Sequence, residues 1–168
     1  HRSIRRQRQM CIRDRVYPEL LHSSPLKPEF LEGVDFVIVR ELTGGLYFGR
    51  PKRRSASTRG RRAVDTLAYS EKEIARVVRV AFELAKSRRQ RLHSLDKMNV
   101  LETGRLWREI ANEVSRDYPE VELIHMLADN AAMKIITNPS EFDVIVAENS
   151  IGDIPVSYTH LTLPTNTP

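Results

Sequence analysis

Short apolar runs alternate with amphipathic segments along this 168-residue chain, and that alternation constrains its fold more than any other feature. The segment VDFVIVREL at 34–42 is almost continuously apolar and β-branched, which is typical of a strand covered on both faces. Further runs at 91–97, 121–128 and 143–149 have the character of shorter strands. Because helical patterns separate these runs, we predict an α/β fold in which strands alternate with helices.

Three segments between and after these runs have the pattern of helices. The clearest covers 70–90, where Ser70 and Glu73 form a capping-box signature and apolar residues recur with helical spacing. A second amphipathic segment covers 103–117, and a shorter one covers 129–137. Each predicted helix can therefore bury one apolar face against the predicted sheet.

A polar segment, RPKRRSASTRGRRA at 50–63, interrupts the alternation. It holds seven lysines or arginines and no acidic residue, together with one glycine and one proline. We predict an exposed loop or arm there. Cations in such a run are more often a solvated face than a nucleic-acid patch, and no aromatic residues lie among them to stack on bases.

The two ends of the chain have a pattern that indicates a non-native origin. Residues 5–15, RRQRQMCIRDR, and residues 155–165, PVSYTHLTLPT, can be encoded by DNA strings that are reverse complements, with all eleven residues matching. The string also resembles an adapter of transposase-based sequencing libraries. We therefore expect 1–15 and 155–168 to be artefactual tails around a native but incomplete central domain at 16–154.

Excluding the tails changes what the composition implies. The whole chain has 27 basic and 22 acidic residues, a surplus that would suggest an anionic partner. Residues 1–15 contribute six arginines and one aspartate, and 155–168 contribute no charge, so 16–154 holds 21 of each sign. The only cysteine, Cys11, is in a tail, which leaves the native part without a thiol for a disulfide or a metal. No apolar stretch approaches the roughly 20 residues of a membrane helix.

Polar side chains gather at the carboxyl end of each predicted strand, the edge at which open α/β sheets bind ligands. The four groups are Arg40 with Tyr47, Asp96 and Lys97 with Asn99, Asp129 with Asn130, and Asn149 with Asp153. Each group alone has an ordinary structural interpretation, such as a surface ion pair or a helix cap. Together they are complementary, because arginine binds carboxylates, aspartates bind hard divalent cations, and lysine and tyrosine transfer protons.

Five stretches resemble one enzyme family in their order and spacing. VRELTGGLYFG, SLDKMNVLE, DNAAM, FDVIVAEN and GDI are similar to the central part of the metal-dependent decarboxylating 2-hydroxyacid dehydrogenases, which include the isopropylmalate, isocitrate, homoisocitrate and tartrate enzymes. TGG followed by LYFG is characteristic of the isopropylmalate branch. The resemblance covers essentially all of 16–154, and it implies the central domain of the isopropylmalate/isocitrate dehydrogenase fold, with a dimerisation arm that includes 50–63.

The resemblance also implies an activity, which is the NAD-dependent oxidative decarboxylation of (2R,3S)-3-isopropylmalate to 4-methyl-2-oxopentanoate in leucine biosynthesis. The implied roles are Arg40 as the carboxylate anchor, Tyr47 as the acid that protonates the enol, Lys97 as the group that helps remove the hydroxyl proton, Asn99 as a contact of the NAD nicotinamide end, and Asp129 and Asp153 as Mg²⁺ or Mn²⁺ ligands. In the family, the equivalents of Lys97 and Asp129 reach the active site from the neighbouring subunit of a homodimer.

Further expectations follow from the same resemblance. The partners would be a small-molecule substrate and a second copy of the chain, without nucleic acid or membrane, and the location would be the cytoplasm. A third metal-binding aspartate of the family falls at Ser157, inside a predicted tail. We therefore expect the 168-residue chain to be inactive alone.

Three alternatives stay open at this point. A sibling enzyme would act on tartrate, homoisocitrate or isocitrate. A basic nucleic-acid-binding module is the alternative if the tails are genuine. The third is a dimerisation domain without catalytic activity.

Overall fold

The computed structural model describes residues 9–15 and 33–162. In these ranges a five-stranded sheet has the order β1-β2-β7-β5-β6, in which only β1 is antiparallel to its neighbour. The strands are β1 (Gln9–Arg15), β2 (Asp35–Glu41), β7 (Val144–Ala147), β5 (Arg91–Asp96) and β6 (Glu122–Leu127). The carboxyl ends of the four parallel strands therefore meet at one edge of the sheet.

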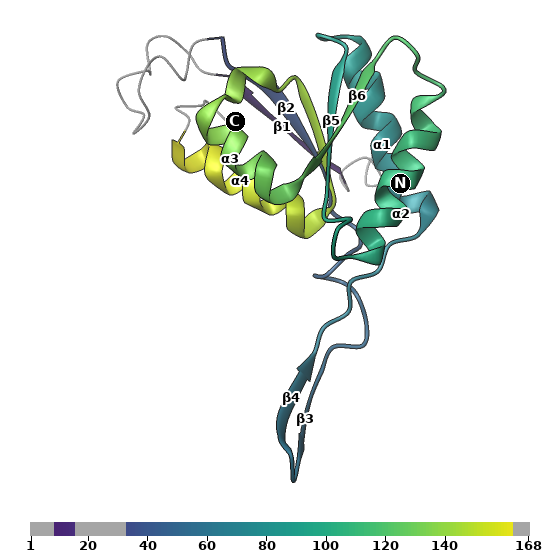
Figure 1. Cartoon of the computed structure of the whole chain (residues 1–168), viewed down its shortest axis with the longest axis vertical. Coiled ribbons are helices and arrows are strands. Elements are labelled where there is room, and N and C mark those ends of the chain that lie inside the picture. The colour runs from purple at the N-terminus through teal and green to yellow at the C-terminus, as the bar shows by residue number, and fades with distance from the viewer. Residues whose placement is uncertain (1–8, 16–32, 163–168) are drawn as a thin grey trace, which may run out of the picture.

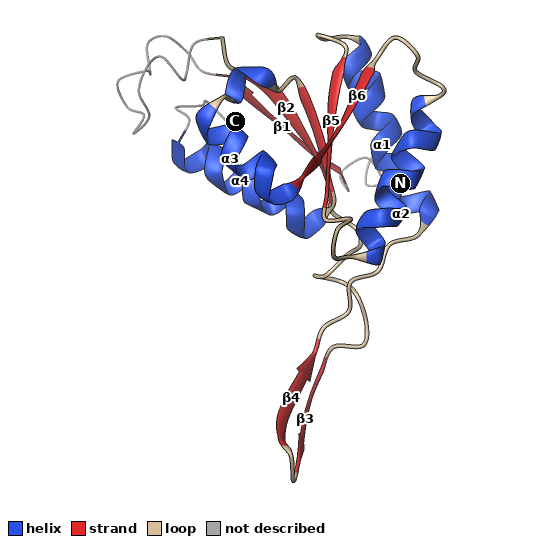
Figure 2. Ribbon diagram, in the orientation of Figure 1, coloured by secondary structure: helices blue, strands red, loops and turns tan. Residues whose placement is uncertain are grey.

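Helices cover both faces of this sheet (Figure 1, Figure 2). They are α1 (Glu71–Lys86) and α2 (Glu102–Ser115) on one face and α3 (Ala128–Thr137) and α4 (Asn149–Thr162) on the other, with a short 3-10 helix η4 (Pro139–Glu141) after α3. Within β2, Val37 and Val39 pack with α1 and α2, whereas Phe36 and Ile38 belong to the core on the opposite face. The predicted α/β fold is confirmed, and the apolar run of β2 is explained by burial on both faces.

Helix α1 begins as its sequence predicts. The Ser70 hydroxyl accepts a hydrogen bond from the Glu73 backbone N–H at 3.4 Å, and the Glu73 carboxylate accepts one from the Ser70 N–H at 2.8 Å. Six apolar side chains of the helix are buried. Burial of each large one stabilises the folded state by roughly 1.5 to 3 kcal/mol. The helix ends at Lys86 rather than at 90, because Gln90 has a φ of 58° and its N–H returns to the Ala85 carbonyl at 3.1 Å.

The segment at 50–63, predicted to be an exposed loop or arm, contains most of a two-stranded hairpin. Strands β3 (Arg53–Ser57) and β4 (Gly60–Val64) pair as an antiparallel hairpin, which projects from the body of the molecule (Figure 1). Nearly every side chain of the two strands is exposed. With no buried face the hairpin has no apolar alternation, so the sequence pattern did not reveal these strands.

The carboxyl end of β7 also differs from the prediction. The strand expected at 143–149 ends at Ala147, and α4 begins at Asn149. The Glu148 carboxylate accepts hydrogen bonds from the N–H groups of Ser150 at 3.0 Å and Ile151 at 2.8 Å, which caps the first turn of α4.

Two elements overlap the predicted tails. Strand β1 lies within 1–15, and α4 continues past residue 154. The boundary predicted at residue 16 lies outside the described ranges, so the assignment of the tails stays a prediction. Across the described ranges, no helix has the length and apolar character needed to cross a bilayer.

The buried histidine of β5, His93, leads to a prediction about the pH dependence of stability. The side chain is fully buried, neither ring nitrogen has a hydrogen-bond partner among the described residues, and the ring centroid lies 4.6 Å from that of Phe142. Burial lowers the pKa of His93 to about 4. In the unfolded chain the pKa is near 6.5, so the stability that the neutral imidazole provides is present above pH 6.5 and is lost as the pH falls toward 4.

We expect His93→Leu to reduce this acid sensitivity. Between pH 6.5 and pH 4 the parent should lose roughly 2 kcal/mol more unfolding free energy than the variant, because only the parent must bury an imidazolium or deprotonate it. Urea unfolding at both pH values measures this difference. Parallel losses in the two proteins would show that His93 does not titrate on unfolding.

Candidate functional site

Arg40, near the end of β2, organises one group of the predicted site residues. The side chain is 9% exposed, and its Nε donates to the backbone carbonyl of Asn149 at 2.9 Å while Nη2 donates to the Asn149 Oδ1 at 3.0 Å. Its Nη1 lies 2.5 Å from Oδ1 of Asp153, one turn further along α4. A Cβ atom on Gly152 would lie 2.9 Å from the Arg40 Cγ, so the glycine makes room for the arginine stem.

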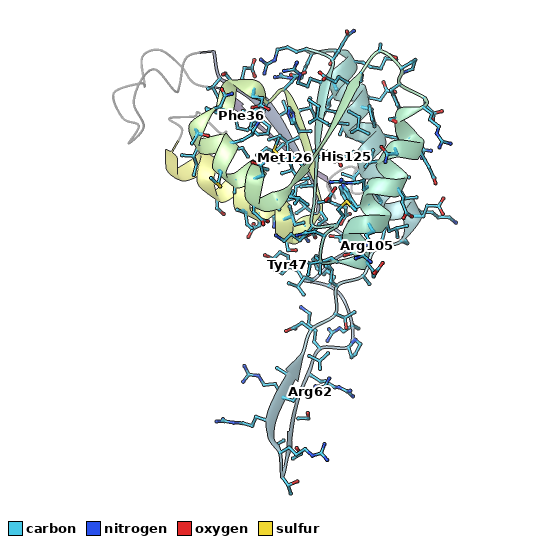
Figure 3. The ribbon with its side chains drawn as sticks, in the orientation of Figure 1. Phe36, Tyr47, Arg62, Arg105, His125 and Met126 are labelled. Atoms are coloured by element: carbon cyan, nitrogen blue, oxygen red, sulfur yellow. The ribbon has the colours of Figure 1, made fainter. Side chains whose placement is uncertain are left out.

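Tyr47 joins this group from the turn that follows β2. Its hydroxyl donates to Oδ2 of Asp153 at 3.3 Å, and the side chain is 48% exposed. Figure 3 shows Tyr47 where the hairpin leaves the body, whereas Arg62 lies far out along the hairpin. A phenol, a carboxylate and a guanidinium therefore meet at the carboxyl edge of the sheet, within reach of solvent. We name Arg40, Tyr47, Asn149 and Asp153 the arginine group.

Glu41 stabilises the turn that carries Tyr47. This buried carboxylate accepts hydrogen bonds from the N–H groups of Thr43 at 2.8 Å and Gly44 at 2.9 Å, and Arg76 of α1 neutralises it at 2.8 Å. Gly45 has a φ of +78°, which favours glycine. A Cβ atom there would also lie 2.7 Å from Cζ of Tyr69.

Lys97 and Asp129 form a second, separate pair. The lysine follows β5 and the aspartate lies in the first turn of α3, and the Lys97 ammonium donates to both carboxylate oxygens. This hydrogen bond lowers the pKa of Asp129. The side chain of Lys97 is 28% exposed and that of Asp129 is 64% exposed, so the pair faces solvent.

Asp96 supports the loop of Lys97 rather than taking part in the pair. Its buried carboxylate accepts from Arg108 at 2.8 Å and from the Met98 N–H at 3.1 Å. A Cβ on Gly104 would lie 2.7 Å from the Lys97 carbonyl carbon, so α2 packs directly against this loop. Asn99 is exposed in the same loop.

The described residues of one chain do not assemble the predicted metal site. No set of three histidine, cysteine, aspartate or glutamate side chains in those ranges is grouped so that it could hold a metal ion. Asp153 is paired with Arg40, and Asp129 is paired with Lys97. Two carboxylates in different groups do not form a coordination sphere.

Sequence reasoning missed three residues that shape this edge. Glu41 holds the glycine turn, Glu148 caps α4, and Tyr69 lies between the two with its hydroxyl 3.0 Å from the Glu148 carboxylate. A buried acidic residue that follows an apolar strand directly, as in VRE and VAE, is the signal that could have identified the two glutamates. Tyr69 had no comparable signal.

Comparisons with known proteins agree with the resemblance. The family description "Isocitrate/isopropylmalate dehydrogenase" matches residues 8–157. The chain is 57% identical over 138 residues to the 3-isopropylmalate dehydrogenase of Priestia megaterium (strain DSM 319 / IMG 1521), covering 82% of this chain and 37% of that protein. It is 55% identical over 141 residues to the enzyme of the same name from Bacillus subtilis (strain 168), covering 83% and 39%.

A solved structure shares the fold. The crystal structure of isocitrate dehydrogenase from Methylococcus capsulatus matches with a TM-score of 0.80 and 25% identity, over 95% of this chain and 46% of that one. The chain therefore spans less than half the length of each of these three proteins.

The contact between the glycine turn and Tyr69 leads to a prediction about stability. Gly45→Ala should destabilise the chain by about 2 to 4 kcal/mol, because it combines a strained φ with a clash against the Tyr69 ring. Gly33→Ala is the matched control, since Gly33 has a similar φ of +72° and no atom of a described residue lies within 4 Å of its Cβ position. Chemical unfolding of both variants measures the difference, and equal losses would show that the ring contact contributes nothing.

Proposed function

Because the chain belongs to the isocitrate/isopropylmalate dehydrogenase family, we propose that it serves the NAD-dependent oxidative decarboxylation of (2R,3S)-3-isopropylmalate to 4-methyl-2-oxopentanoate, a step of leucine biosynthesis. The observation that supports this most is the arginine group at the carboxyl edge of the sheet, where Asp153 contacts both Arg40 and Tyr47. The cytoplasmic location that this pathway implies is part of the proposal.

The side chains have chemically distinct tasks in this reaction. Arg40 binds a carboxylate of the substrate, which its fork of N–H donors suits. NAD⁺, when bound, would accept the C2 hydrogen of the substrate as hydride, while Lys97 helps to remove the hydroxyl proton. The C3 carboxylate then leaves as CO₂, its bonding electrons form an enolate, and Tyr47 donates the proton that C3 takes up.

A homodimer completes the site in this proposal. Lys97 and Asp129 lie in a different group from Arg40 and Tyr47, so we assign them to the active site of a second copy, where Asp129 would join Asp153 in binding Mg²⁺ or Mn²⁺. Asn99, which follows Lys97 in the same exposed loop, would contact the nicotinamide end of NAD. The β3–β4 hairpin supports pairing, because an isolated two-stranded hairpin is marginally stable in water and a second copy can cover it.

A chimera tests the activity. Residues 16–154 of this chain, placed in the matching segment of the Bacillus subtilis enzyme, should reduce NAD⁺ with 3-isopropylmalate and a divalent cation. Tyr47→Phe and Lys97→Ala should each lower kcat by roughly 100-fold or more, because each removes a proton carrier. Tyr118→Phe, a buried tyrosine remote from this edge, serves as the control. A chimera that prefers tartrate, homoisocitrate or isocitrate would assign the segment to a sibling enzyme, and retained kcat in both variants would refute the roles.

Mixing two inactive chimeras tests the shared site. Heterodimers of the Lys97→Ala chimera and the Tyr47→Phe chimera have one intact site if Lys97 acts across the interface. After denaturation and joint refolding, activity should return to roughly a quarter of the parent level, since about half of the dimers are mixed and each has one working site. No recovery, with mixed dimers confirmed by mass spectrometry, would place Lys97 and Tyr47 in the site of one chain.

A further inference from the structure

We propose that Tyr69 is a positioning residue, which fastens the glycine turn after β2 to the start of α4 and thereby fixes Arg40 and Asn149 in the geometry that binds a carboxylate. The inference rests on the proposed function only in naming the ligand of Arg40. The fastening itself is a property of contacts within this chain.

The Tyr69 hydroxyl connects two elements that are far apart in sequence. It donates to the Glu148 carboxylate at 3.0 Å and accepts a hydrogen bond from the backbone N–H of Asn149, also at 3.0 Å. Burial raises the pKa of Tyr69, so the phenol keeps its proton and remains a donor at neutral pH. Through these two bonds Tyr69 sets the backbone at which α4 begins.

The ring of Tyr69 occupies the space beside the glycine turn. Cβ atoms on Gly44 or Gly45 would lie within 3 Å of ring carbons. The Gly45 N–H donates to the carbonyl of Ala68, the residue before Tyr69, at 3.2 Å. The two glycines therefore allow close approach to the tyrosine, in addition to the sharp bend of the backbone.

Asn149 connects the backbone position that Tyr69 fixes to the side chain of Arg40. Its backbone carbonyl and Oδ1 accept both the Nε and Nη2 donors of the arginine, and its Nδ2 donates to the Gly44 carbonyl at 3.4 Å. Arg40 and Asn149 are both buried, so neither can exchange these partners for water. A shift of the Asn149 backbone would leave the guanidinium with poorer acceptors and a different direction.

Tyr69→Phe in the 168-residue chain removes the hydroxyl and keeps the ring. We expect hydrogen exchange at the Arg40 Nε–H and the Asn149 N–H, followed by NMR, to accelerate about tenfold, as the loss of one hydrogen bond would cause. Amides of the central strand β7 should keep their parent rates. Tyr118→Phe is the matched control, because it removes a hydroxyl–carboxylate bond of 2.8 Å to Glu83 outside this edge, and it should change neither signal.

Either of two results would overturn the proposal. The first is parent-like exchange at Arg40 and Asn149 in Tyr69→Phe. The second is equal acceleration at these sites and in β7, which would show a general loss of stability without positioning. If Tyr69→Phe does not fold, a comparison of Glu148→Gln with Ser150→Ala decides by the same readout, since both variants disturb the cap of α4 and only Glu148→Gln weakens the bond to the Tyr69 hydroxyl.

The chimera separates this proposal from the proposed function. In the chimera, Tyr69→Phe should raise KM for 3-isopropylmalate about tenfold and change kcat by less than threefold. The reason is that Arg40, the carboxylate anchor, loses its orientation while Tyr47 and Lys97 remain in place. An inactive chimera would refute the function and leave the exchange result to decide the positioning. An active chimera with unchanged KM in Tyr69→Phe would refute the positioning alone.

Discussion

A buried guanidinium that must keep its charge determines how this edge of the sheet is built. Burying a guanidinium costs free energy unless its N–H donors have acceptors, and this requirement applies to Arg40. Asn149 and Asp153 supply them, and both belong to α4. The hydrogen bonds and the ion pair of Arg40 therefore connect the end of β2 to the start of α4. The arginine group remains accessible to a ligand at the exposed part of Asp153.

The four charged residues that the sequence predicted as site residues form two ion pairs within the chain. Asp153 neutralises Arg40, and Asp129 neutralises Lys97. A ligand with two carboxylates and a divalent cation would have to exchange these pairings, with the carboxylate replacing Asp153 on the arginine and the cation replacing ammonium or guanidinium on the aspartates.

The sequence predicted the architecture well where the physics is local and periodic. The capping box of Ser70 and Glu73 and the doubly buried β2 follow from patterns that a few residues define, and the structure confirms both. The hairpin at 50–63 and the helix from Asn149 were not predicted. The hairpin lacks a buried face, so its strands show no apolar alternation. Glu148 stabilises the first turn of α4, but it follows an apolar run and was therefore predicted to belong to a strand.

The sequence predicted which polar side chains lie at this edge, but not how they pair. Strand ends placed Arg40, Tyr47, Asn149 and Asp153 at one edge, and the structure brings these four together. Their division from Lys97 and Asp129 depends on side-chain directions after β5 and β6, which periodicity does not specify. Tyr69 was not predicted because its importance comes from partners about 25 residues before it and 79 and 80 residues after it in the chain.

The most direct test of this account is a crystal structure of the chimera with 3-isopropylmalate and Mn²⁺. We expect a substrate carboxylate on Arg40, Asp153 together with Asp129 of the other copy on the manganese, and Lys97 of the other copy on the same substrate. A substrate that contacts Arg40 and Lys97 of one chain, or that binds without Arg40, would contradict it.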